Sequence, residues 1–198
     1  MTTGPSFALR CALLGLALAA AGIPPAQAQG GLELAQLMQE LRAVKAARGR
    51  FVERKYLAIL STPLESSGTL VYTAPGRLEK HMLSPRKESL ILDGDTLLVE
   101  RRDGQRRFAL QEHPVVWAFA ESIRSTLAGD LDTLNRFYQV TLEGDAGRWR
   151  LRLKPTEPRM RNIAAEIVLS GSGAWVGAIE IEEAGGDRSV MTITRDAA

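Results

Sequence analysis

The stretch 148-RWRLRLKP-155 alternates apolar and basic side chains, and this alternation decides the fold class. In an extended chain the two kinds of side chain point to opposite sides, with Trp149, Leu151 and Leu153 on one side and Arg148, Arg150, Arg152 and Lys154 on the other. A period of two is typical of an antiparallel sheet with one buried and one solvated face. We therefore expect a mainly β chain whose sheet is covered on one side.

The same period continues in the stretches around it. In 174-AWVGAIEIEE-183, Ile179 and Ile181 oppose Glu180 and Glu182. In 66-SSGTLVYTAPGRLEKHMLSP-85, two half-buried strands meet at a Pro-Gly turn. Four apolar side chains are expected to point inward: Leu70, Tyr72, Leu78 and Met82. Lys80 lies on the same face of its strand as Leu78 and Met82. The Asp-Gly pairs at 93–94 and 103–104 predict further hairpin turns. Together these patterns predict a large antiparallel meander.

Helical spacing replaces the strand period in two places. Residues 32–47 predict an amphipathic helix that Gly49 ends, before the strand period begins at Phe51. In the middle of the chain a helix is expected to begin at Pro114 and reach Gly129, and Asp130 is expected to cap a second, short helix. The order is a helix, about six strands, a helical pair and four or five more strands. It predicts one α+β domain over residues 29–198, in which about 10–11 strands curve strongly and the helices cover them.

The N-terminus has the features of a secretory signal peptide. An apolar run from Cys11 to Gly22 follows Arg10 and leads to a small-x-small site that ends at Ala28. Residues 1–28 are therefore expected to be cleaved, which would remove the single cysteine and leave disulfides and thiol chemistry out. Without Arg10, the Lys and Arg residues outnumber the 23 acidic residues by one. This balance argues against a nucleic-acid partner.

Enzymatic sites find little support in the sequence. His81 and His113 are the two histidines, and their spacing matches no metal-binding motif. The acidic pairs at 93–95 and 130–132 fit turn and helix-cap roles. The arginines at 101, 102, 106 and 107 flank a hairpin turn and fit a solvated sheet edge, and contact with anionic lipid headgroups stays open as an alternative. We therefore expect no enzyme activity, no catalytic residue, no metal and no cofactor.

The inner face of the sheet holds the candidate binding residues. Large aromatic and flexible Met side chains on such a face suit an apolar ligand site, and they also suit a packed core. Periodicity does not separate a cavity from a solid core, so both remain open. The candidates for a hydrophobic cavity wall are Leu70, Tyr72, Leu78, Met82, Leu97, Trp117, Trp149, Leu151, Leu153, Ile167, Leu169, Ile179 and Ile181.

A series of short motifs in a fixed order resembles the LolA-like family of periplasmic outer-membrane lipoprotein carriers and LolA-related proteins. It covers residues 32–195, nearly all of the expected mature chain. The motifs are 51-FVERK-55, 63-PLESSGTL-70, 72-YTAPGRLEK-80, 83-LSP-85, 88-ESLILDGDTL-97, 127-LAGDLDTL-134 and 186-GDRSVMTITR-195. In the carriers a Phe-x-Gln pattern lies on the first strand, whereas this chain has Glu53 at the Gln position. An arginine linked to lid closure is also implied, for which Arg54 and Arg77 are the candidates.

The resemblance implies a fold and a function. The fold is an open half-barrel closed by helices, with a cavity for acyl chains. The function is that of a monomeric periplasmic carrier, which takes acylated cargo, a lipoprotein or another lipid, from an inner-membrane exporter and passes it to an outer-membrane acceptor. Two alternatives stay open: a lipid-sensing regulatory module of the envelope with a protein partner, and, less favoured, an enzyme that acts on a lipid.

Overall fold

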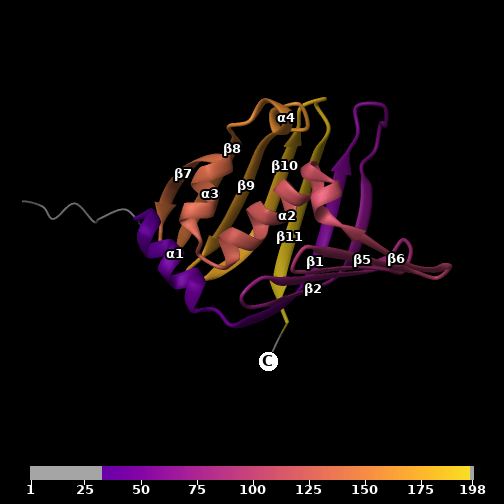
Figure 1. The fold of residues 1–198 in the computed structure, drawn as a ribbon, viewed down its shortest axis with the longest axis horizontal. Coiled ribbons are helices and arrows are strands. Elements are labelled where there is room, and N and C mark those ends of the chain that lie inside the picture. Colours follow the sequence, from indigo (N-terminus) through magenta and orange to yellow (C-terminus); the bar gives the residue numbers. More distant parts are fainter. Residues whose placement is uncertain (1–32, 197–198) are drawn as a thin grey trace, which may run out of the picture.

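One antiparallel sheet of 11 strands organises the molecule in the computed structural model, which describes residues 33–196 (Figure 1). Its strands are β1 (Ala46–Tyr56), β2 (Leu64–Thr73), β3 (Arg77–Ser84), β4 (Glu88–Asp93), β5 (Thr96–Arg101), β6 (Gly104–Ala109), β7 (Tyr138–Asp145), β8 (Arg148–Pro155), β9 (Ala164–Ser172), β10 (Trp175–Glu183) and β11 (Arg188–Arg195). The helices are α1 (Leu34–Ala43), α2 (Pro114–Leu127), α3 (Leu131–Phe137) and α4 (Pro158–Arg161), with a 3-10 turn, η1 (Leu110–Glu112).

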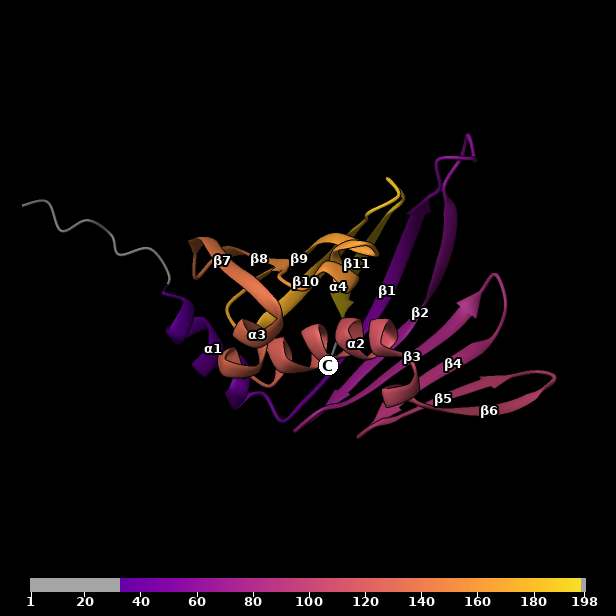
Figure 2. The same cartoon turned by 45° about the horizontal axis from the view of Figure 1, so that its top comes forward.

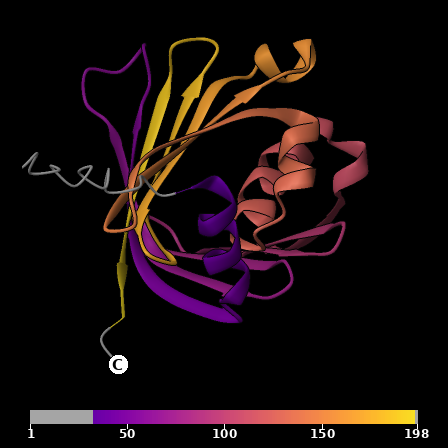
Figure 3. The same cartoon turned by 90° about the vertical axis from the view of Figure 1, so that its left-hand side faces the viewer.

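The sheet joins two hairpin series through its first and last strands. The order β6-β5-β4-β3-β2-β1-β11-β10-β9-β8-β7 follows the chain except at β1 and β11, where Phe51 pairs with Ile193. The sheet remains open because β6 and β7 form its two edges. It curves around α1, α2 and α3, which lie in its hollow (Figures 2 and 3). The expected open, curved, helix-covered antiparallel half-barrel is confirmed.

The first helix is shorter than the sequence pattern suggests. The helix α1 ends at Ala43, because Val44 has extended backbone angles of φ −73° and ψ 116°. The expectation that Gly49 ends this helix is wrong, since Gly49 lies inside β1. A Cβ on Gly49 would lie 2.8 Å from the Thr194 carbonyl oxygen and 3.0 Å from the Trp175 ring. The glycine is therefore explained by close packing at this point of the sheet.

The central helices begin and end as their sequence signals predict. Pro114 occupies the first turn of α2, and Gly129 follows this helix with a φ of +63°, which favours glycine. Asp130 then caps α3 by accepting a 3.0 Å hydrogen bond from the Thr133 amide. The predicted signal peptide lies outside the described residues. Between residues 33 and 196 no helix is long and apolar enough to span a bilayer.

Packing differs between the two halves of the sheet. The helices α1 and α3 fill the hollow over β7–β11 and β1 with a dense core, whose buried members include Leu37, Leu41, Phe51, Leu134, Trp149, Leu151, Leu153, Ile167 and Leu169. In β3, by contrast, each inward side chain is only half-buried, and β5 has no fully buried residue. The inner face is thus densely packed beneath α1 and α3 and less completely covered at β3 and β5.

Candidate ligand-binding cavity

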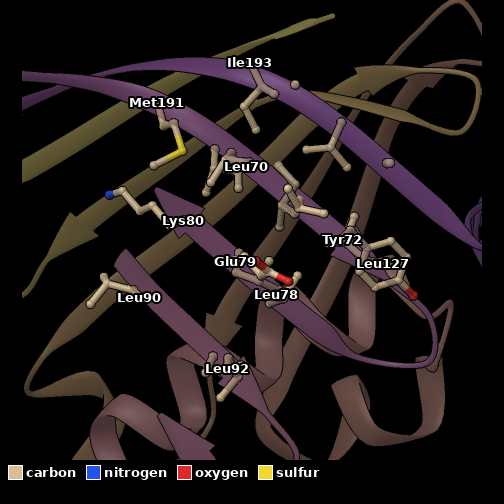
Figure 4. Close-up of a pocket in the computed structure, with 18 of the residues that line it drawn as sticks. Leu70, Tyr72, Leu78, Glu79, Lys80, Leu90, Leu92, Leu127, Met191 and Ile193 are labelled. Carbon is tan, nitrogen blue, oxygen red and sulfur yellow. The ribbon is translucent and has the colours of Figure 1, made fainter. Parts of the chain in front are cut away.

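A cavity of about 330 Å³ lies between α2 and the inner face of the sheet (Figure 4). Leucine side chains of β2–β5 and β9 form much of its wall, and α2 covers it. The main apolar lining residues are Leu70, Tyr72, Leu78, Leu90, Leu92, Leu97, Val116, Phe119, Ile123, Leu127, Leu169, Ile179, Ile181, Met191 and Ile193. A volume in the range of about 300–1,000 Å³ with an apolar lining is typical of sites for small apolar ligands.

Two side chains of the covering helix remain partly exposed. The helix α2 contacts α3, α1, η1 and α4. Val116 and Phe119 on it are 43% and 37% exposed, although both line the cavity. Large apolar side chains normally lose most of their exposure in a completed core. Val116 and Phe119 therefore form an apolar surface on α2 that the described residues cover only in part.

A second cavity of about 310 Å³ adjoins the first. Val116, Phe119 and Ile181 line both of them. Tyr138 lines the second cavity, and burial raises the pKa of its phenol to about 12 although a hydrogen bond with Ser122 acts in the opposite direction. The Tyr138 hydroxyl therefore stays neutral at physiological pH, and the space on the two sides of Phe119 is lined mainly by apolar groups.

Charged side chains interrupt the apolar wall at Arg48, Glu53, Glu79 and Lys80, and Ser189 adds a hydroxyl. Glu53 accepts hydrogen bonds from Lys80 Nζ at 2.6 Å, from Ser189 Oγ at 2.8 Å and from Ser66 Oγ at 3.3 Å. The Lys80 ammonium also lies 5.0 Å from the centre of the Phe51 ring. Burial raises the pKa of Glu53, but the Lys80 charge and the three hydrogen bonds outweigh it, so the pKa lies below the ordinary 4.5. Glu53 is thus an inward-facing carboxylate with a compensating cation.

Arg124 connects the covering helix to two turns of the sheet. Its Nη1 donates a 2.7 Å hydrogen bond to the Gly94 carbonyl oxygen at the β4–β5 turn, and its Nη2 pairs with Glu121. At the β2–β3 turn, a Cβ on Gly76 would come within 2.5 Å of the Arg124 side chain. The two arginines suggested for a lid bond within the sheet instead: Arg54 to Glu65, and Arg77 to Glu79 and Asp93.

A family model described as "Outer membrane lipoprotein carrier protein LolA-like" matches residues 26–198. The chain belongs to this LolA-like family. It is 28% identical over 166 residues to an outer-membrane lipoprotein carrier protein of Cupriavidus taiwanensis, covering 80% of this chain and 74% of that protein. It is 26% identical over 183 residues to a protein of the same description from Cupriavidus pinatubonensis, covering 90% and 82%.

Among solved structures, a LolA superfamily protein from Nitrosomonas europaea is similar to the LolA-like chain with a TM-score of 0.45 and 10% identity. The match covers 85% of this chain and 96% of that one.

The structure divides the predicted wall residues of the LolA-like chain into two groups. Seven of them line the main cavity: Leu70, Tyr72, Leu78, Leu97, Leu169, Ile179 and Ile181. Ile167 lines the second cavity. The other five do not line either cavity: Trp149, Leu151 and Leu153 are buried in the core, Met82 packs against that core, and Trp117 stacks edge-on against Phe137 of α3.

Sequence reasoning missed other lining residues of the LolA-like chain. Leu90 and Leu92 alternate within β4, and Met191 and Ile193 alternate within β11, so the period of two could have found all four. Ile123 and Leu127 lie one helical turn apart on α2 and carry the corresponding helical signal. Nothing in the sequence indicated that Glu53 lines the cavity, because a charged residue at an inward position interrupts the apolar alternation.

Neither histidine of the LolA-like chain lines the cavity, although His81 contacts the lining residue Glu79. His81 contacts Ser89 through Nδ1 and Glu79 through Nε2, both at 2.9 Å, while His113 meets the Phe108 ring edge-on. Within residues 33–196 no group of three His, Cys, Asp or Glu side chains could hold a metal ion. The arginines at 101, 102, 106 and 107 flank the turn into the edge strand β6.

Proposed function

We propose that this chain is a carrier that binds acyl chains of a lipoprotein or another lipid in the cavity beneath α2. The observation that supports this most is an apolar space of about 330 Å³, covered by a helix whose Val116 and Phe119 stay partly exposed, in a member of the LolA-like family. On this proposal the acyl chain contacts the seven predicted residues that line the cavity, from Leu70 on β2 to Ile181 on β10.

Transfer free energies favour such a site. Each buried CH₂ group contributes about 0.8 kcal/mol, so an acyl chain does not leave a membrane for water at a useful rate without a carrier. A cavity that takes up only part of the chain contributes part of that free energy. It can therefore bind the cargo and still release it to a membrane or to a second protein.

The complete proposed route runs from the inner to the outer membrane across the periplasm. An inner-membrane exporter would load the cargo, and an outer-membrane acceptor would receive it. Support comes from the curated relatives, which are described as outer-membrane lipoprotein carrier proteins. The predicted signal peptide agrees with a location in the cell envelope. On this proposal the chain acts as a monomer and performs no chemical reaction.

Binding and transfer can be tested with the purified chain, residues 29–198. A fluorescent fatty acid should bind saturably at one site and should be displaced by unlabelled oleate. The protein should then accelerate movement of the probe from donor to acceptor vesicles in proportion to its concentration. Absence of saturable binding would contradict the acyl site, and binding without accelerated transfer would favour a sensor over a carrier.

A further inference from the structure

Glu53, Lys80, Ser66 and Ser189 form a polar cluster on the inner face, where four neighbouring strands meet. They come from β1, β3, β2 and β11, and Glu53, Lys80 and Ser189 line the cavity. Charged groups on an apolar wall are costly unless they are paired. Here each carboxylate oxygen of Glu53 accepts at least one hydrogen bond, so the cluster is a built polar site.

The strand register explains how Lys80 reaches Glu53 from two strands away. Lys80 pairs with Leu70 on β2, and Glu53 pairs with Ser66 on the same strand. The inward position of β2 between Leu70 and Ser66 is Gly68, which has no side chain. The long lysine side chain reaches across β2 and places its ammonium 2.6 Å from the Glu53 carboxylate.

The cluster retains hydrogen-bonding capacity. A lysine ammonium has three N–H donors. Among the described residues Lys80 donates one hydrogen bond, to Glu53, and its remaining contact is with the face of the Phe51 ring. At least one N–H donor thus remains for a ligand. Because Glu53 neutralises the ammonium, the Lys80–Glu53 pair itself carries no net charge.

The cluster lies at the end of the cavity away from the α2 contact. Leu78 is near the β2–β3 turn that Arg124 touches, and Lys80 is the next inward residue along β3 (Figure 4). The Lys80 and Glu53 side chains keep 25% and 19% of their exposure. The cavity therefore has an apolar part beneath α2 and a polar, partly solvated part between β1, β3 and β11.

We propose that the Lys80–Glu53 pair binds the carbonyl oxygen of an uncharged, ester- or amide-linked acyl group, and that it selects such ligands over free fatty-acid carboxylates. This inference rests on the proposed acyl-binding function. A carbonyl oxygen accepts a hydrogen bond from Lys80 and adds no charge. A carboxylate at the same place would lie near Glu53, where like charge and lost hydration both oppose its binding.

The test compares monooleoylglycerol with oleate, which share one acyl chain, by displacement of a fluorescent fatty acid at pH 8. Glu53→Gln leaves the Lys80 charge unopposed, so the affinity ratio of monooleoylglycerol to oleate should fall about tenfold. Lys80→Met leaves Glu53 unopposed, so the same ratio should rise. Glu65→Gln, which removes a carboxylate from an exposed pair with Arg54, is the matched control and should leave the ratio unchanged.

The two variants must shift the ratio in opposite directions for the inference to hold. If both ligands bind and neither variant changes the ratio, the head-group site is wrong and the acyl cavity stands. If the wild-type chain binds neither ligand, the acyl-binding function itself is wrong, and the inference falls with it. Circular dichroism shows whether each variant is folded. A shift opposite to the predicted one in either folded variant contradicts the inference.

Discussion

Arg124 Nη1 on α2 donates a 2.7 Å hydrogen bond to the carbonyl oxygen of Gly94, and this contact ties the cavity cover to the β4–β5 turn. Arg124→Ala removes it and leaves Glu121 without its arginine. We expect a loss of about 1–3 kcal/mol in the free energy of unfolding and faster release of a bound fatty acid. Urea unfolding and stopped-flow displacement measure the two effects.

The matched control for this change is Arg106→Ala, on the exposed edge strand β6. It should alter neither stability nor release. Hydrogen exchange localises the effect further, since the α2 amides should exchange faster in Arg124→Ala. Equal release rates in wild type and Arg124→Ala would show that the Arg124–Gly94 hydrogen bond does not hold α2 over the bound ligand.

A charge on the cavity wall should oppose an acyl chain. Leu97→Glu and Leu70→Glu each place a carboxylate in the apolar lining, so fatty-acid affinity should fall at least tenfold. Leu83→Glu on β3 is the control, because Leu83 is 58% exposed and does not line the cavity. If the wall variants are folded and bind as tightly as Leu83→Glu, the ligand lies elsewhere.

Core and cavity wall should respond differently to the same truncation. Leu151 is fully buried, so Leu151→Ala should cost about 2–5 kcal/mol of stability and leave ligand affinity nearly unchanged. Leu97 is only half-buried and lines the cavity, so Leu97→Ala should cost less stability and lower the affinity. Denaturant unfolding and fluorescence titration separate the two outcomes. If Leu151→Ala lowered the ligand affinity and Leu97→Ala did not, the assignment of Leu151 to the core and of Leu97 to the cavity wall would be wrong.

Acid should weaken the fold partly through Glu53. Burial raises the pKa of this carboxyl, but Lys80, Ser189 and Ser66 lower it more, so the folded-state pKa is below 4.5. A lowered folded-state pKa means that the carboxylate stabilises the fold above about pH 4.5 and loses this effect as pH falls through the folded-state value. The drop in urea midpoint between pH 6 and pH 3 should therefore be smaller in Glu53→Gln than in wild type.

The remaining acid sensitivity in that variant has identifiable sources. The hydrogen bond from Arg77 lowers the pKa of Glu79, and the bonds from Thr133 lower the pKa of Asp130. Because Glu79 and Asp130 are still protonated at low pH, the urea midpoint of Glu53→Gln should still fall somewhat between pH 6 and pH 3. An unchanged drop would mean that the Glu53 cluster does not contribute to stability.

The sequence predicts much of this fold because local signals and the global pattern agree. The strict alternation around Trp149 indicates the buried face, and the signals at Pro114 and Asp130 mark the central helices. Gly49 misled the prediction of the first helix, because a glycine required by close strand packing looks like a glycine that ends a helix. The pairing of β1 with β11 joins distant segments and leaves no local signal.

The cavity was harder to predict than the sheet. Trp149 and Leu97 both occupy inward positions, yet one is core and the other lines open space. The difference depends on what fills the space above each strand, since side chains of α1 and α3 complete the core that contains Trp149, whereas the space beside Leu97 stays open. Lys80 could be assigned to the inner face from its spacing, whereas its pairing with Glu53 joins β3 to β1 across β2 and leaves no local signal.

Photo-crosslinking with a fatty acid that has a diazirine at its terminal carbon tests the central claim most directly. If the acyl chain lies beneath α2, adducts should map to the apolar part of the cavity, at Leu78, Leu92, Leu97, Ile123 and Leu127, and excess oleate should suppress them. Adducts confined to exposed apolar residues such as Ile59 and Leu83, or adducts that oleate does not suppress, would contradict it.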